Sequence, residues 1–155
     1  SEYADEYPEA TYHEDEQPWS VECDVALPCA TQNELDEGAA KLLLKNGCIA
    51  VSEGANMPTT LEGVKAFHDA KIMYGPGKAA NAGGVAVSGL EMSQNSERVS
   101  WNHERLGEEL AELMDGIHDK CVEFGEADGY VDYVRGANIA GFKKVADAML
   151  AFGAV

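Results

Sequence analysis

The sequence has 155 residues, 45% of them hydrophobic, which is enough to bury the core of one ordinary globular domain. Its formal net charge of -17 disfavours nucleic acid and anionic membranes as partners, because both prefer a basic surface. No apolar run approaches the length of a bilayer-spanning helix, and the first residues are acidic where a signal peptide would be basic. The composition therefore predicts a soluble protein that binds neither nucleic acid nor membrane.

The four cysteines have no spacing typical of a metal site, and no CxxC pair occurs among them: Cys23, Cys29, Cys48 and Cys121. At least two lie in apolar runs, where a buried free thiol is the usual occupant. The pattern predicts a reducing, cytoplasmic compartment and no bound metal.

Residues 1–20 are acidic, contain tyrosines and prolines and have no sustained period, so we expect a partly helical surface segment followed by a loop. The pattern then becomes regular. Short apolar runs at 24–29, 48–52 and 72–74 predict buried strands of a parallel sheet.

Two helices are predicted between these strands. The first has apolar residues at helical spacing and ends at the stop signal Asn46-Gly47. Asn33 could cap it. The second opens with Thr60 as a capping residue. The inward-facing residues are Leu35, Ala39, Leu42 and Leu43 in the first helix and Leu61, Val64 and Phe67 in the second. Alternating strands and helices are typical of a parallel sheet with crossover helices, so the predicted core is doubly wound α/β. We expect the crossovers to be right-handed.

Beyond Gly84 the chain is predicted to be helical almost to its end. One helix covers Val85–Val99, a long helix follows, and a last helix covers Asn138–Phe152. Apolar stripes on the last two helices are predicted core positions. They are Leu106, Leu110, Leu113, Met114, Ile117, Cys121 and Phe124, then Ile139, Phe142, Val145, Met149 and Leu150.

A cluster of small and polar residues follows each predicted strand. The clusters are Ala30-Thr31-Gln32-Asn33, Glu53-Gly54-Ala55-Asn56 and Gly75-Pro76-Gly77-Lys78. Ligands bind at this edge of open parallel sheets, because loops diverge there and helix N-termini present free N–H groups. The joint placement predicts one ligand cleft. For a single cluster a structural role stays open, such as Asn56 serving as a turn residue before Pro58.

Residues 77–95 combine small residues with Lys78 and Asn81 and are predicted to line one side of this cleft. A tightly packed crossing of helix and loop is the alternative. Residues 75–80 also fit the G-x-G-x-x-A pattern of a dinucleotide-binding turn. We reject that match, because Pro76 is awkward in the tight turn and the expected acidic residue, Glu97, ends a helix rather than a strand.

Four long motifs resemble the carboxyl-terminal portion of hexameric bacterial glutamate dehydrogenases, in the same order and over essentially the whole chain. They are Pro28–Glu34, Glu53–Thr60, Lys78–Asn95 and Gly136–Leu150. The resemblance implies the second half of a Rossmann-type doubly wound parallel sheet followed by C-terminal helices. It also implies that residues 1–132 are part of a dinucleotide-binding domain and that 133–155 form a helix packing on a substrate domain outside this chain.

The activity implied by the resemblance is reversible oxidative deamination of L-glutamate to 2-oxoglutarate and ammonia, with hydride transfer to NADP. NAD is the alternative cofactor, since the residues that would read the ribose 2′ position precede Ser1 in the resembled enzymes. Their catalytic lysines and aspartate also lie upstream, so no catalytic residue is assigned here. The complete enzyme would be a cytoplasmic homo-oligomer, a hexamer.

The resemblance also assigns site residues. Ala30 and Thr31 would lie along the nicotinamide ribose, and Asn56 would hydrogen-bond the nicotinamide carboxamide. Ser88 would bind the side-chain carboxylate of the substrate, and Val85 would form a wall of the same pocket.

A second function class stays open, a stand-alone binding or interaction module that keeps the fold without catalysis. A sheet starting at Asp24 would have an exposed apolar edge, which is unstable unless another half completes it. That edge favours the enzyme. The four histidines lie on acidic or amphipathic stretches and are expected to be solvated surface residues: His13, His68, His103 and His118.

Overall fold

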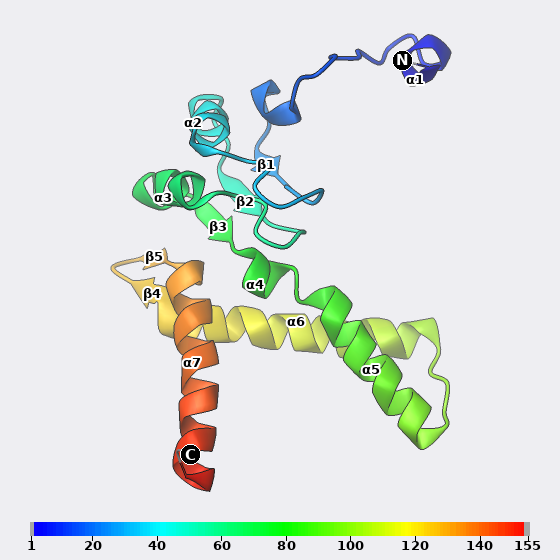
Figure 1. Cartoon of the computed structure of the whole chain (residues 1–155), viewed down its shortest axis with the longest axis vertical. Helices are drawn as coiled ribbons and strands as arrows, with labels where there is room; N and C mark the ends of the chain where they lie inside the picture. The colour runs from blue at the N-terminus through cyan, green and yellow to red at the C-terminus, as the bar shows by residue number, and fades with distance from the viewer. Residues whose placement is uncertain (1, 154–155) are drawn as a thin grey trace.

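A parallel three-stranded sheet, seen in the computed structural model in the order β1-β2-β3, forms the centre of the N-terminal half (Figure 1). The structure describes residues 2–153; Ser1 and residues 154–155, which belong to the two expected terminal segments, lie outside them. The strands are β1 (Val25–Ala26), β2 (Ala50–Ser52) and β3 (Met73–Gly75). The predicted parallel sheet is therefore confirmed; β1 and β2 are shorter than their apolar runs, and β3 is shifted by one residue.

Two helices, α2 (Glu37–Lys45) and α3 (Leu61–Asp69), pack together over one face of this sheet. The core between the helices and the sheet contains buried residues of both helices, of the strands and of the loops between them: Ala26, Leu35, Ala40, Leu43, Cys48, Val51, Phe67 and Tyr74. The Phe67 and Tyr74 rings stack with their centroids 5.7 Å apart. Burial of these side chains is the main favourable contribution to this half of the fold.

Both helices begin at side-chain caps. Asp36 Oδ1 accepts a hydrogen bond from the Ala39 N–H at 2.8 Å, and Thr60 Oγ1 accepts one from the Gly63 N–H at 3.3 Å. Each cap satisfies an N–H group that has no partner within its helix. The predicted Thr60 cap is confirmed, and so is the stop after α2, where Gly47 has a φ of 88°.

One alternative and one expectation for this half are wrong. Asn33 does not cap α2; its backbone has a φ of 57° and its N–H donates to the Met57 carbonyl instead. Leu61, the first residue of α3, is 84% exposed and does not face inward. Phe67, from the same predicted stripe, is fully buried, and Val64 is half-buried.

The C-terminal half is helical, as predicted, but contains two unpredicted elements. Its helices are α4 (Gly77–Ala80), α5 (Gly83–Glu97), α6 (His103–Gly125) and α7 (Tyr133–Phe152). An antiparallel hairpin, β4 (Glu126–Ala127) and β5 (Tyr130–Val131), joins α6 to α7. Neither α4 nor the hairpin was expected from the pattern. The last helix also begins before Asn138, because Asp132 caps it by accepting from the Arg135 N–H at 2.9 Å.

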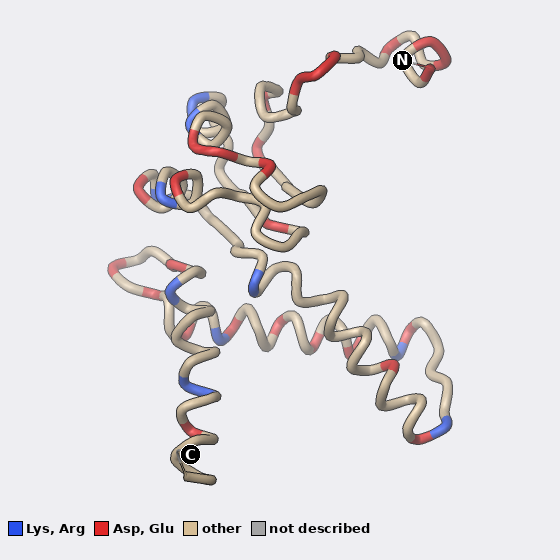
Figure 2. Tube along the Cα trace, viewed as in Figure 1, with Lys and Arg blue, Asp and Glu red and all other residues tan. Residues whose placement is uncertain are grey.

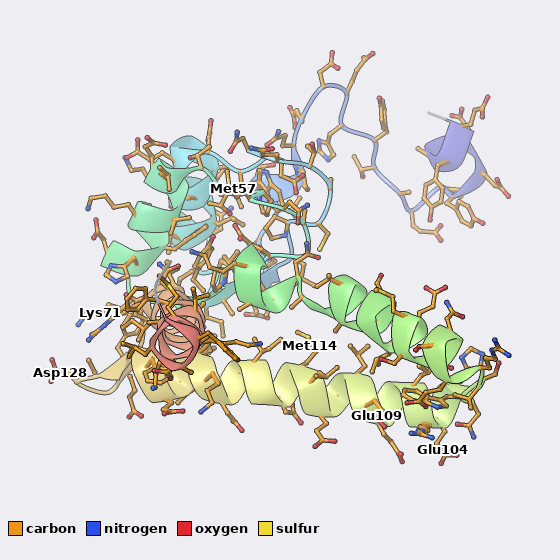
Figure 3. The ribbon with its side chains drawn as sticks, turned by 60° about the horizontal axis from the view of Figure 1, so that its bottom comes forward. Met57, Lys71, Glu104, Glu109, Met114 and Asp128 are labelled. Atoms are coloured by element: carbon orange, nitrogen blue, oxygen red, sulfur yellow. The ribbon has the colours of Figure 1, made fainter. Side chains whose placement is uncertain are left out.

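The predicted stripe of α6 is largely confirmed. Met114 lies on the side of α6 that faces α4 and α5, whereas Glu104 and Glu109 point away from α5 (Figure 3). Cys121 is buried, and the other stripe residues are half-buried except Leu113, which is 42% exposed. The expectation that Leu113 is a core residue is thus wrong.

The stripe predicted for the last helix is not a core in this structure. Only the first part of α7 packs against α6, and the rest projects away from the other elements (Figure 1). Four of the five stripe residues are exposed: Phe142, Val145, Met149 and Leu150. Ile139, nearest the start, is half-buried.

The crossing of α6 and α7 depends on Gly136, a buried residue. A Cβ at this position would overlap the Cys121 backbone carbonyl. The two helices can therefore approach this closely only if residue 136 has no side chain.

We expect Gly136→Ala to lower the free energy of unfolding by about 1–3 kcal/mol, the usual cost of overpacking. Thermal denaturation measures the change. Gly141→Ala is a matched control on the same helix, because a Cβ there meets nothing within 4 Å. It should be neutral or slightly stabilising. Equal melting temperatures for the two variants would contradict this account of the crossing.

The sheet has an uncovered apolar edge, as predicted. Among the described residues β1 pairs only with β2, and Val25 and Leu27 are 51% and 61% exposed. Met73, on the same face as Val25, is 58% exposed. This half of the fold thus presents apolar surface that its own described residues do not cover.

The N-terminal segment extends away from the sheet and is rich in acidic residues (Figures 1 and 2). It contains the short helices α1 (Glu2–Glu6) and η1 (Pro18–Ser20), which confirms the expected partly helical surface segment. Within residues 2–153, no helix combines the length and apolarity needed to cross a lipid bilayer.

Candidate functional site

The three loops that leave the carboxyl ends of the strands are joined by backbone hydrogen bonds. The Gly54 N–H donates to the Pro28 carbonyl at 2.9 Å, and the Glu53 N–H donates to the Gly75 carbonyl at 3.0 Å. The predicted clusters therefore form one connected edge. Met57 marks the middle loop in Figure 3.

Ala30 and Thr31 lie exposed at the tip of the first loop. The Ala30 N–H donates to Glu34 Oε1 at 3.0 Å, which closes the loop over residues 30–34. The small side chains of this tip leave its surface open to a ligand.

Asn56 lies exposed in the second loop and contacts the third. Its Oδ1 accepts a hydrogen bond from Asn81 Nδ2 at 3.0 Å, while its own Nδ2 donates to no described residue. Asn81 is the C-cap residue that directly follows α4. The contact fixes the orientation of the Asn56 amide and leaves a donor free for a ligand.

Lys78 turns away from these loops. Its Nζ donates to Asn138 Oδ1 at 2.7 Å, joining α4 to α7. Lys78 also lines a groove of about 750 Å³ between α6 and α7, with Ile117, Cys121 and Phe124 among its apolar lining. Burial raises the pKa of the Cys121 thiol above its ordinary value. Lys78 therefore lines a groove beside α7, and the expectation that it lines the cleft at the strand ends is wrong.

Val85 and Ser88 lie near the start of α5, and both are exposed. Ser88 Oγ donates to the Gly84 carbonyl of its own helix at 3.2 Å. No described hydrogen bond joins either residue to the three loops. The structure thus brings Asn56 and Asn81 together and leaves Val85 and Ser88 on a separate, accessible surface.

Glu53 is the residue of this edge whose importance the sequence pattern did not reveal. It is only 4% exposed, and its carboxylate accepts three hydrogen bonds. The donors are the Tyr74 hydroxyl at 2.5 Å, the Thr59 N–H at 3.2 Å and the Gly77 N–H at 2.5 Å. A glutamate directly after an apolar strand was the available signal.

The contact with Gly77 supports the rejection of the dinucleotide-turn match. The Gly77 N–H is occupied by Glu53 Oε2, and a Cβ at Gly77 would come within 2.6 Å of the Ala55 carbonyl oxygen. Residue 77 is glycine because the second loop packs against it. Its N–H is not open to a phosphate group.

The described part of the chain holds no group of three or more histidine, cysteine, aspartate or glutamate side chains that could bind a metal ion. The four histidines are exposed, as expected. One of them, His68, contacts Asp132 with its Nε2 3.1 Å from Oδ2. Two of the four free cysteines, Cys48 and Cys121, are buried.

A family model described as Glutamate/Leucine/Phenylalanine/Valine dehydrogenase matches residues 1–153. The chain belongs to this family. Its relatives include the glutamate dehydrogenase of Bacteroides thetaiotaomicron, 61% identical over 155 residues, which cover 99% of this chain and 35% of that protein. The NADP-specific glutamate dehydrogenase of Escherichia coli is 56% identical over 155 residues, which cover 100% of this chain and 34% of that enzyme. Other relatives are named NAD(P)-specific or NAD-specific.

The fold of the chain also matches solved structures. The glutamate dehydrogenase of Plasmodium falciparum superposes with a TM-score of 0.93 at 49% identity, over 99% of this chain and 33% of that one. The match confirms the expected Rossmann-type fold class. The chain spans about a third of the length of the relatives that it matches.

Proposed function

We propose that this chain is part of a glutamate dehydrogenase that catalyses the reversible oxidative deamination of L-glutamate to 2-oxoglutarate and ammonia with NADP. The observation that carries the proposal is the similarity to named glutamate dehydrogenases along the whole chain. NADP-specific enzymes among these relatives favour NADP over NAD. The linked edge formed by the three loops supplies a surface of the kind that binds ligands in parallel sheets.

Within this proposal, Asn56 holds the nicotinamide carboxamide, and Ala30 and Thr31 lie along the adjoining ribose. The free Nδ2 of Asn56, oriented by Asn81, supports the first role. The exposed small side chains of the loop tip support the second. The nicotinamide ring supplies the hydride acceptor when it is bound. Its orientation decides which face receives the hydride, so these residues act by positioning.

Ser88 and Val85 form the part of the substrate pocket that this chain contributes. The Ser88 hydroxyl is exposed and bonded only to a carbonyl of its own helix, so it can turn to donate to a carboxylate. Val85 is 73% exposed one turn earlier and can pack against the methylene groups of the substrate.

The assay that tests the proposal follows NADPH oxidation by the complete protein that contains this chain. We expect oxidation that requires both 2-oxoglutarate and ammonium, and the reverse reaction with glutamate and NADP. Oxidation that continues when ammonium is withheld would indicate a different reaction.

Asn56→Ala in the complete protein should raise the dissociation constant of NADPH and lower turnover. Loss of one desolvated polar contact costs on the order of 1–3 kcal/mol. Fluorescence titration of NADPH measures the change. Asn46→Ala removes an amide that donates to the Ser20 carbonyl, away from the three loops, and should leave the dissociation constant unaltered. If both variants bind NADPH as the parent does, Asn56 is only a turn residue.

The remaining elements of the proposal concern the complete protein. Residues 1–132 belong to its dinucleotide-binding domain, and residues 133–155 pack on its substrate domain. The exposed apolar side chains of α7 support the second assignment, since a further domain would bury them. The complete protein is a cytoplasmic homo-hexamer, as the resemblance implies. Light scattering of the purified protein gives its mass and tests the subunit number.

A further inference from the structure

The Glu53 carboxylate is buried, and no lysine, arginine or histidine of the described residues forms an ion pair with it. Burying an unpaired carboxylate is costly unless hydrogen bonds replace its hydration. Here three donors do so. Burial and the hydrogen bond to Glu53 raise the pKa of Tyr74, so its hydroxyl stays protonated and remains a donor.

The two oxygens of this carboxylate connect different parts of the edge. Oε1 accepts from the Thr59 N–H, which closes the second loop over residues 53–59. Oε2 accepts from the Gly77 N–H, at the first residue of α4. The side chain thus ties the base of the loop that carries Asn56 to the start of α4, the helix that Asn81 follows.

Asn56 and Asn81 touch one another, so their relative position depends on how the second loop sits against α4. Besides the contact between Asn56 and Asn81, the bond from the Gly77 N–H to Glu53 is the one side-chain hydrogen bond described between these two segments. We propose that Glu53 is a positioning residue, which sets the orientation of the Asn56 amide by holding the second loop and α4 together through its buried carboxylate. The proposal rests on the proposed function, because it presumes that Asn56 binds the cofactor.

The chemistry requires a carboxylate. Both oxygens of an ionised glutamate accept hydrogen bonds, whereas glutamine offers one accepting oxygen and one donating NH₂ group. In Glu53→Gln the oxygen can keep Tyr74 and Thr59, and the NH₂ group then faces the Gly77 N–H, donor against donor. The substitution therefore releases α4 while it preserves the volume of the side chain.

The experiment compares three variants of the complete protein: Glu53→Gln, Glu53→Asp and Tyr74→Phe. Tyr74→Phe is the matched control, because it removes a donor from the same carboxylate and leaves the contacts with Thr59 and Gly77 in place. Melting temperature reports stability, NADPH fluorescence titration reports cofactor affinity, and steady-state assays separate KM from kcat.

We expect Glu53→Gln to weaken NADPH binding and to lower kcat by about tenfold each, in keeping with a lost hydrogen bond to a charged group. Glu53→Asp keeps the charge with a shorter reach and should recover part of the loss. Tyr74→Phe should lower the melting temperature as much as Glu53→Gln does, while affinity and kcat stay within about twofold of the parent. Only the positioning role separates the two variants in this way.

Equal effects of Glu53→Gln and Tyr74→Phe on melting temperature, with NADPH affinity and kcat unchanged in both, would overturn the proposal and leave Glu53 a structural residue. Equal losses of NADPH affinity and kcat in Glu53→Gln and Tyr74→Phe would also overturn the proposal. If Glu53→Gln does not fold, Glu53→Asp against Tyr74→Phe makes the same comparison. A parent protein that binds no NADPH would instead refute the proposed function, so the two failures are distinguishable.

Discussion

The isolated 155-residue chain should show no glutamate-dependent reduction of NADP. The described loops form one connected edge of the sheet, and Lys78, which follows the third strand, is engaged with Asn138. Catalysis needs positioning and proton transfer together, and losing such groups removes several powers of ten of rate. The purified chain is assayed beside the complete protein at equal molar concentration.

Circular dichroism of the isolated chain is the control, because an unfolded chain would be inactive for a trivial reason. The exposed apolar edge at Val25 and Leu27 also predicts that the isolated chain self-associates. Turnover by the folded chain comparable to that of the complete protein would show that these residues suffice for catalysis.

Ser88→Ala in the complete protein should lower kcat/KM for glutamate by at least about tenfold, since a hydrogen bond to a charged group contributes roughly 1.5–3 kcal/mol. The loss should appear mainly in KM. Folding should not suffer, because the hydroxyl bonds only the Gly84 carbonyl of its own helix and alanine is the better helix former. Steady-state kinetics and thermal denaturation measure the two effects.

Norvaline provides the control substrate for this variant, as it lacks the side-chain carboxylate. Its kcat/KM should be nearly unchanged in Ser88→Ala. If glutamate and norvaline lose activity equally, Ser88 shapes the start of α5 and does not read the substrate.

Local signals along the sequence predicted the first half of the fold well. Thr60 caps α3 as expected, because capping depends on the residue itself and on the N–H groups that follow it. The three strands were found from their apolar runs, although β1 and β2 are shorter than their runs and β3 is shifted by one residue. Cys48, for instance, lies outside β2 because its N–H donates to the Leu43 carbonyl at the exit from α2.

Patterns that depend on distant neighbours were predicted less well. The spacing of Phe142, Val145 and Met149 marks an apolar face, but periodicity does not say what covers it. In this chain nothing among the described residues does. Leu61 likewise has an apolar side chain at helical spacing, yet as the first residue of α3 it is exposed.

The sequence predicted where the candidate site lies, but not the contacts between its loops. The three clusters do meet at one edge, since the carboxyl ends of parallel strands lie together. The central contact, between the Glu53 carboxylate and the Gly77 N–H, joins residues from different loops and has no sequence signature. The short helix α4 was missed for a related reason, because Gly77 is a poor helix former held in place by that contact.

The specificity of the complete protein for its amino acid tests the account most directly, because the matched family includes glutamate, leucine, phenylalanine and valine dehydrogenases. The measurement is kcat/KM with NADP for each of these four amino acids under one set of conditions. We predict that glutamate is preferred by several powers of ten, since a site built for a charged group strongly rejects substrates that lack it. A preference for leucine, phenylalanine or valine would contradict the account.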